Sequence, residues 1–277
     1  MRRVHLCILC SSLEGVDRFT KALINRGCNL KADGRPILGI DSEELLKMLL
    51  DADPQALMIP AHAWTPWFAV FGSQSGFDSL EECFGEMTPH IHAIETGLSS
   101  DPKMNWRLPS LDQVFLVSNS DAHSLDKLGR EANVFEMQEP SFAELRRILV
   151  EKDVKKFIET IEFFPEEAKY HVDGHRLCDF SCTPQETKRL KGLCPKCGKP
   201  LTVGVLHRID DLAERAEGER GKLAVPFRSI VPLAELIGSV LDVGPSSKKV
   251  GREVERLVKD GRTEFGILLD EPAQVLS

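Results

Sequence analysis

Short apolar runs alternate with amphipathic helical patterns through the first half of the chain, and this alternation limits the folds available to it. Runs of strand length lie at residues 4–9, 56–62, 92–97, 114–120 and 132–137. Helical patterns with apolar residues on one face lie at residues 13–27, 42–53, 79–87 and 141–153. Strands that alternate with helices predict parallel strands in an α/β sheet or barrel.

The second half of the chain has a different organisation. Residues 155–170 indicate an extended, edge-like segment that leads into a Cys/His-rich module. Three helical patterns follow, and residues 264–270 predict a last strand that returns to the body. We therefore expect three regions: a β/α portion at 1–154, a zinc-ribbon module at 155–207 and a helical C-terminal region at 208–277.

Composition limits the classes of function. The chain has 277 residues, of which 42% are hydrophobic and 28% charged, which is typical of a globular cytoplasmic protein. No run approaches the roughly 18 consecutive apolar residues of a membrane span. The formal net charge of −8 argues against a wholly basic nucleic-acid binder, but residues 176–199 hold six Lys or Arg against two Asp or Glu. An acidic body with a basic module fits metal-binding carboxylates in one place and phosphate contacts in another.

Four residues have the spacing of a structural zinc ribbon, His175-x2-Cys178-x15-Cys194-x2-Cys197. Two pairs of ligands on two tight turns can close the tetrahedron that Zn²⁺ prefers. The second pair lies in CPKCGKP, where proline and glycine shape the turn. The first pair is ambiguous, since His171 can replace His175 and Cys182 can replace either member. Four protein ligands leave no open position, so this site is expected to be structural.

A second group of candidate ligands lies on or after other predicted strands. Asp121 and His123 end one strand, and side chains at positions i and i+2 of a strand point the same way. His62 follows another strand, and His5 lies within the first. A single histidine in an apolar strand is usually a core residue, but three with an aspartate favour a metal site. Glu95 is a further ligand, or an acceptor that orients a histidine.

Several phrases of the sequence resemble a known family. SNSDAH, IPAHAWTPW and an early VH strand are similar to metal motifs of the polymerase-and-histidinol-phosphatase (PHP) phosphoesterases. GFDSLEECFGEMTPHIHAIETGLSSDPKMNWRLPSLD, SDAHSLDKLGREANVF and CPKCGKPLTVGVLHRIDDLAER resemble the endonuclease Q family, and the resemblance covers nearly the whole chain. It implies a PHP-type distorted β/α barrel, incomplete at its N-terminus, followed by a zinc ribbon and a small helical C-terminal region.

The resemblance also implies an activity. Members of the family are metal-dependent endonucleases that cut DNA 5′ of deaminated bases such as uracil, hypoxanthine and xanthine, or at abasic sites. By position, His5, His62, Asp121 and His123 would bind Zn²⁺, Mn²⁺ or Mg²⁺, with the last three as the catalytic set and Glu95 as their support. Such ions bind the scissile phosphate and lower the pKa of a water. No G-x-x-x-x-G-K-[ST] motif occurs, so helicase activity is unsupported.

One departure from the family pattern affects the expected activity. The PHP pattern begins with an H-x-H on its first strand, whereas this sequence starts four residues before His5. Its H-x-H, at His90 and His92, is in the wrong place for that role. We therefore expect either an N-terminally truncated barrel or one whose missing ligands come from another chain. In both cases this chain should bind metal weakly and have little nuclease activity by itself.

Candidate DNA contacts are aromatic side chains of the HAWTPW segment and basic side chains of the Cys/His module. Trp64 and Trp67 could stack on an extruded base, or else pack in the core. Phosphate contacts are expected from Lys188, Arg189 and Lys191, which could equally be a solvated surface.

Two other functions are consistent with the sequence. The first is a small-molecule phosphoesterase of the PHP type, although such an enzyme has no need of a zinc ribbon or the C-terminal helices. The second is a non-catalytic zinc-ribbon DNA-binding protein, which the missing H-x-H favours.

Overall fold

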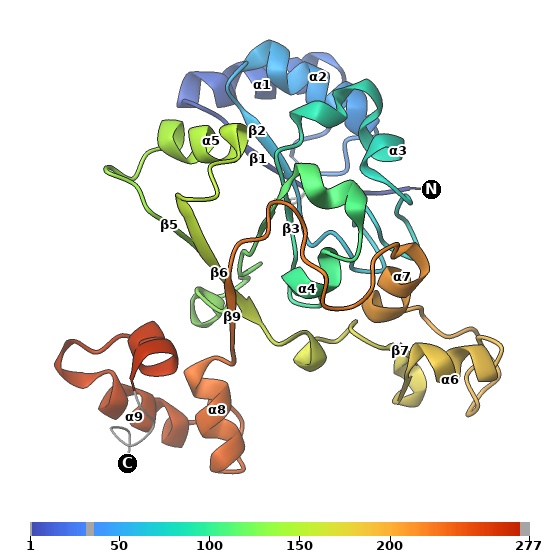
Figure 1. The fold of residues 1–277 in the computed structure, drawn as a ribbon, viewed down its shortest axis with the longest axis vertical. Helices are drawn as coiled ribbons and strands as arrows, with labels where there is room; N and C mark the ends of the chain where they lie inside the picture. The colour runs from blue at the N-terminus through green and yellow to red at the C-terminus, as the bar shows by residue number, and fades with distance from the viewer. Residues whose placement is uncertain (1, 32–35, 272–277) are drawn as a thin grey trace.

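The computed structural model describes residues 2–31 and 36–271, which form a mixed α/β fold (Figure 1). The strands are β1 (Leu6–Leu9), β2 (Leu57–Pro60), β3 (Ala93–Glu95), β4 (Phe115–Val117), β5 (Ala132–Phe135), β6 (Phe157–Phe163), β7 (Asp173–His175), β8 (Phe180–Cys182) and β9 (Phe227–Ile230). The helices are α1 (Leu13–Asn25), α2 (Ser42–Ala52), α3 (Leu80–Phe84), α4 (Pro102–Asn105), α5 (Phe142–Glu151), α6 (Pro184–Arg189), α7 (Val205–Leu212), α8 (Leu233–Val240) and α9 (Lys248–Leu257). The five strands and four helices predicted in the first half are therefore all present.

Side-chain caps explain where several of these helices begin. A serine precedes four of them, and its hydroxyl accepts a hydrogen bond from a backbone N–H of the first turn, as in Ser12 of α1 and Ser141 of α5. Thr183 and Glu186 form a reciprocal capping box at α6. Asp41 precedes α2 without a side-chain cap bond.

Strand direction differs from the prediction. The described strands form four small sheets, none of which closes into a barrel. Parallel pairing joins β3 to β4 and β6 to β9, but β1–β2, β5–β6 and β7–β8 are antiparallel. The parallel strands predicted in the first half are confirmed for β3–β4 but wrong for β1–β2, because apolar periodicity carries no information on direction. Between β1 and β2 the chain passes through two helices, α1 and α2, and so returns antiparallel.

The three-stranded sheet takes one strand from each of the three predicted regions, in the order β5–β6–β9. β6 is its central strand, so the edge-like character expected for residues 155–170 is wrong. The last four residues of β6, from Thr160 to Phe163, are all buried, as expected for a central strand. The boundaries at 154/155 and 207/208 stay predictions, and this sheet crosses both of them.

Two groups of buried side chains make up the core of the body. One group lies under α1, α2 and α3, with Leu46, Leu49 and Phe84 almost inaccessible. The other lies between α5 and the strands, around Ile148 and Phe157. Figure 1 shows the first three helices gathered beside β1 and β2, with α8 and α9 at the opposite end of the molecule.

The last predicted strand, at residues 264–270, is wrong. Gly266–Asp270 forms a helical turn that begins where Thr263 accepts hydrogen bonds from the backbone N–H groups of Gly266 and Ile267. A short apolar run cannot be assigned to helix or strand by periodicity alone. In the described part of the chain, no helix combines the length and apolar character required to cross a membrane.

Candidate functional site

Two of the predicted ligands, His5 and His62, meet in the structure. The Nδ1 atom of His5 lies 3.0 Å from Nε2 of His62, and both side chains are half-buried. Thr65 Oγ1 lies 2.9 Å from Nδ1 of His62, so both ring nitrogens of that histidine have a polar neighbour. Two imidazoles 57 residues apart thus converge on one point.

Local backbone geometry fixes this convergence. The carbonyl of His5 accepts from the backbone N–H of Ala61, which continues the β1–β2 pairing to the histidines. His62 itself has φ 31°, in the left-handed region that non-glycine residues rarely adopt. Gly97, at φ +68°, packs against it, and a Cβ there would lie 2.8 Å from His62 Cα. Only glycine suits both that conformation and that approach.

The buried Glu95 carboxylate links two segments of the site by hydrogen bonds. One oxygen accepts from the backbone N–H of His62 at 2.5 Å, and the other accepts from Asn119 Nδ2 at 2.8 Å. The side chain is 3% exposed, and burial raises the pKa of Glu95 although these two hydrogen bonds oppose the rise. Glu95 therefore connects the ends of β2, β3 and β4.

Asp121 and His123 lie at the exposed rim of the site. Their side chains are 41% and 63% exposed, and His123 Nδ1 lies 3.9 Å from Asp121 Oδ1 and 2.9 Å from its carbonyl. Arg130 secures this loop by donating to the carbonyls of Ser120 and Asp121. The negative charge of Asp121 contributes to the raised pKa of both Glu95 and Cys7, although burial is the larger cause in each case. The carboxylate is thus close enough to the buried part of the site to influence it.

The Cys/His module gathers a complete set of metal ligands. The ligand atoms of four residues all lie within 4.8 Å of one another: His175, Cys178, Cys194 and Cys197. Within residues 2–31 and 36–271, no other group of three or more such side chains meets this condition. Hence the strand-end histidines and Asp121 do not form a comparable cluster.

The two alternative ligands have other partners. His171 is buried, and its Nδ1 lies 3.2 Å from the Ser99 carbonyl. Cys182 is buried with its thiol 3.3 Å from Thr187 Oγ1. Of the candidates that the sequence left open, only His175 lies in the cluster, where its Nδ1 is 3.5 Å from Cys197 Sγ.

The thiols of this cluster influence one another. Hydrogen bonding to Cys197 and then burial raise the pKa of Cys178 to about 11. The pKa of Cys194 is lowered: burial opposes this, but backbone N–H groups of Lys196 and Cys197 donate to its sulfur. Backbone donors aimed at a thiolate are typical of a metal-binding turn. Lys196 Nζ donates to the carbonyls of Cys178 and Asp179, so it braces the two halves of the cluster.

A buried pair of glutamates lies beside the site, and the sequence analysis missed it. Glu162 accepts from Thr160 Oγ1 at 2.5 Å and from Thr96 Oγ1 at 2.9 Å. Glu131 Oε1 accepts from a backbone N–H, whereas its Oε2 is buried without a hydrogen-bond partner. Burial raises the pKa of Glu162 to about 7, and burial and then repulsion from Glu162 raise that of Glu131 well above its usual range. The signal in the sequence was a carboxylate inside the apolar run FIETIEFF.

The two predicted stacking residues have different environments. Trp64 is 1% exposed, stacks on Phe71 at 4.6 Å between ring centroids and donates to Asn105 Oδ1 at 2.7 Å. It is a core residue, and its predicted contact with a base is wrong because no face of the ring is accessible. Trp67 is 42% exposed and stays a candidate. Lys188 and Arg189 lie on α6, and Lys191 follows its end.

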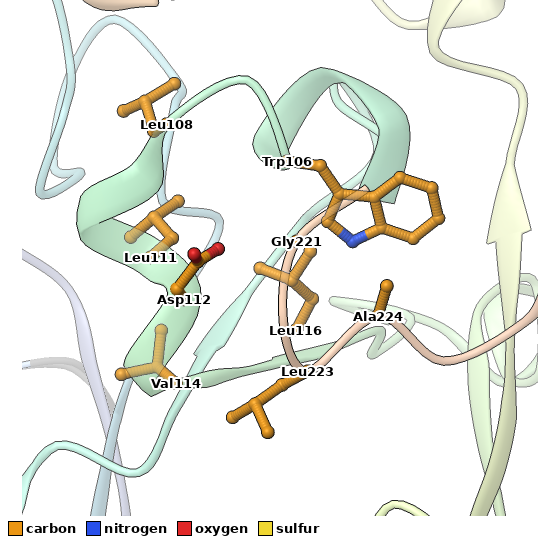
Figure 2. A pocket seen from close by; sticks show the side chains of 9 residues that line it. All are labelled: Trp106, Leu108, Leu111, Asp112, Val114, Leu116, Gly221, Leu223 and Ala224. Atoms are coloured by element: carbon orange, nitrogen blue, oxygen red, sulfur yellow. The ribbon is translucent and has the colours of Figure 1, made fainter. Parts of the chain in front are cut away.

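The internal pocket that Figure 2 shows is not a substrate site. Its volume is about 10 Å³, which leaves room for about one water molecule. It is lined mainly by apolar side chains around Trp106, and its one carboxylate, Asp112, is paired with Arg215 at 2.5 Å. This pocket is therefore too small for any ligand larger than a water molecule.

Comparison with other proteins identifies relatives over most of the chain. No protein-family model matches it. An uncharacterized protein of Methanocaldococcus jannaschii is 30% identical over 223 residues, which are 78% of this chain and 27% of that protein. The uncharacterized protein YqxK of Bacillus subtilis is 30% identical over 271 residues, which are 96% of this chain and 63% of that protein. The chain thus spans less than two thirds of either curated relative.

Two solved structures are similar over almost the entire chain. A lesion-specific endonuclease from Pyrococcus furiosus has a TM-score of 0.86 and 32% identity, covering 99% of this chain and 67% of its own. Endonuclease Q in complex with a 27-mer duplex that has an abasic lesion at the active site gives a TM-score of 0.88 and 32% identity, covering 99% and 68%. The chain belongs to the endonuclease Q family. The resemblance in the sequence is thereby confirmed, while the small open sheets described here do not by themselves establish a PHP barrel.

The buried glutamates give this endonuclease Q relative a testable pH dependence. Because the pKa of Glu162 is raised from 4.5 to about 7 on folding, the folded state binds more protons than the unfolded state in that interval. Stability should therefore fall as the pH rises from about 4.5 to 7. We expect Glu162→Gln to raise the melting temperature more at pH 8 than at pH 5, by a few degrees.

Thermal unfolding of both proteins at the two pH values measures this difference. Glu167, which is exposed, provides the matched control: Glu167→Gln should change the melting temperature equally at both pH values. An equal effect of Glu162→Gln at pH 5 and pH 8 would contradict the assignment of a raised pKa to this carboxyl.

Proposed function

We propose that this chain acts in the metal-dependent hydrolysis of DNA at damaged nucleotides. The observation that carries the proposal is the convergence of His5, His62 and Glu95 in a fold that matches solved endonuclease Q structures over 99% of its length. One of those relatives is described as lesion-specific, and another binds a duplex with an abasic lesion at its active site. Abasic DNA is therefore the first proposed substrate, and DNA with uracil, hypoxanthine or xanthine is the second.

The histidine pair is suited to hold a metal ion. Two nitrogens bonded to one Zn²⁺ at about 2.0–2.1 Å lie roughly 3.3 Å apart, and the His5–His62 separation of 3.0 Å is close to this value. Asp121 and His123, on the rim, would add oxygen and nitrogen ligands for Zn²⁺, Mn²⁺ or Mg²⁺. Such an ion, when bound, polarises a phosphate and lowers the pKa of a water.

The remaining side chains have positioning roles in this proposal. Glu95 fixes the backbone of His62 and the amide of Asn119, so it sets the direction of the imidazole without reaching the substrate itself. Thr65, beside Nδ1 of His62, leaves Nε2 directed at His5 and the shared site. Arg130 holds the carbonyls of the Asp121 loop and thereby restricts where the rim carboxylate can go.

We assign the Cys/His cluster to one structural Zn²⁺. Three thiols and an imidazole are ligands that Zn²⁺ favours, and four protein ligands leave no open position for substrate. Lys188, Arg189 and Lys191 are proposed phosphate contacts on the same module. A cytoplasmic location stays a prediction from composition.

Substitution of one thiol tests the zinc assignment. Cys197→Ser should reduce the bound zinc from about one ion per chain to nearly none, because three ligands hold Zn²⁺ far less tightly than four. Elemental analysis of the purified protein measures the ratio. Cys83→Ser, a buried cysteine outside the cluster, should leave it unchanged. Zinc retained by the Cys197 variant would argue that the ion lies elsewhere.

Cleavage of a labelled duplex tests the proposed activity. With Mn²⁺, Mg²⁺ or Zn²⁺ supplied in turn, we expect slow incision at an abasic site, in keeping with the weak activity predicted from the missing H-x-H. His62→Ala should reduce it to background, since a metal ligand is removed. His90→Ala, an exposed histidine, is the control and should match the unmodified chain.

A second function is favoured by one specific observation. Asp121 and His123 lie on the rim, and no strand-end cluster of three ligands forms in the described residues. If the chain binds abasic duplex but incises none of these substrates with any of the three metals, it acts as a DNA-binding module. If it neither binds nor cuts DNA, the proposed function is wrong.

A further inference from the structure

Three aromatic side chains are gathered at the surface beside the histidine pair, and we call them the aromatic surface: Trp67, Phe68 and Tyr170. Trp67 and Phe68 are 42% and 45% exposed, whereas other large rings such as Phe71 and Phe84 are fully buried. The Tyr170 ring, on the segment that leads into the Cys/His module, meets Trp67 edge to face at 6.0 Å between centroids. Residues more than 100 positions apart thus share one accessible patch.

Hydrogen bonds attach this surface to both histidines. The carbonyl of Phe68 accepts from the backbone N–H of His5 at 2.8 Å. Thr65 Oγ1 donates to the Trp67 carbonyl at 3.1 Å and lies 2.9 Å from Nδ1 of His62. The exposed rings are therefore held at a fixed position next to the proposed metal ligands.

The backbone adopts an unfavourable conformation where it presents these rings. Phe68 has φ +62°, a left-handed conformation that is unfavourable for a bulky side chain. Ser75 Oγ stabilises it by accepting from the Phe68 N–H at 2.8 Å. The ring is thus held partly exposed, at 45%, by a backbone conformation that a bulky residue rarely adopts.

Cationic groups flank the rings at both ends. The guanidinium carbon of Arg3 lies 5.8 Å from the Phe68 ring centroid, and Lys169 Nζ lies 5.0 Å from that of Tyr170. Aromatic rings interleaved with cations suit single-stranded nucleic acid, in which bases stack on rings and phosphates meet positive charge. This complementarity of charge favours a nucleotide over an apolar peptide as the occupant.

We propose that the aromatic surface stacks unpaired bases of the DNA strand next to the phosphate held at His5 and His62. The inference rests on the proposed function and adds to it Phe68, from the same segment as Trp67, and Tyr170, which the sequence analysis did not single out. The Tyr170 carbonyl accepts from the Val205 N–H at the start of α7, which joins the aromatic surface to the helix that follows the Cys/His cluster. A strand that leaves the histidines across Trp67 and Tyr170 would then approach the basic side chains of that module.

Intrinsic fluorescence provides a direct test. The chain has three tryptophans, and Trp64 and Trp106 are only 1% and 7% exposed, so quenching by a stacked base must come mainly from Trp67. We expect an oligothymidylate and an abasic duplex to quench the unmodified protein. Trp67→Leu should abolish the quenching, and Trp67→Leu and Tyr170→Leu should each weaken binding about tenfold.

Two control variants separate stacking from loss of structure. Trp67→Phe keeps a ring and should bind within about threefold of the unmodified protein. Phe164→Leu removes a ring that is 41% exposed but outside the aromatic surface, and it should bind normally. Circular dichroism establishes that each variant is folded.

The possible failures are distinguishable. If the unmodified protein binds DNA by fluorescence anisotropy, yet tryptophan emission does not change and the Leu variants bind equally well, the aromatic surface is not a nucleotide site. If the unmodified protein binds neither the oligothymidylate nor the abasic duplex, the proposed function itself is overturned, and this inference with it.

Discussion

The buried carboxylate of Glu95 is the constraint on which the site depends. Its two oxygens accept from the backbone of His62 and the amide of Asn119, and so join the ends of three strands, β2 of one small sheet and β3 and β4 of another. Isolated two-stranded sheets are marginally stable, so contacts of this kind and the shared core hold them in place. The cost is an acidic group at 3% exposure, which the hydrogen bonds offset.

In the Cys/His module a similar buried carboxylate joins β7 to α7, and α7 in turn contacts the body. Asp173 is fully buried and accepts from the N–H of Gly204 and from Nδ1 of His207, both at 2.6 Å. Arg208, the next residue, donates to the carbonyl of Phe71 at 2.9 Å. These contacts connect the Cys/His module, with its basic side chains, to the part of the body that holds the histidine pair and the aromatic surface.

Sequence reasoning located most elements and most polar residues, but not their mutual geometry. Apolar periodicity was sufficient for α1, α2 and α5, and paired spacing was sufficient for the Cys/His cluster, because these signals are local. Strand direction, the exposure of Asp121 and the burial of Trp64 depend on contacts between distant segments, which periodicity does not encode. Tyr170 and Glu162 were missed for the same reason: a single tyrosine or glutamate acquires meaning only from its neighbours in space.

The central claim is that His5 and His62 hold a divalent metal beside the bound phosphate. Titration of the isotope-labelled protein with Mn²⁺, followed through imidazole signals in two-dimensional NMR spectra, tests it without relying on turnover. The account predicts that the signals of His5 and His62 broaden at the lowest Mn²⁺ concentrations while that of the exposed His90 persists. Broadening of His90 at the same concentrations, or unchanged signals from the histidine pair, would contradict it.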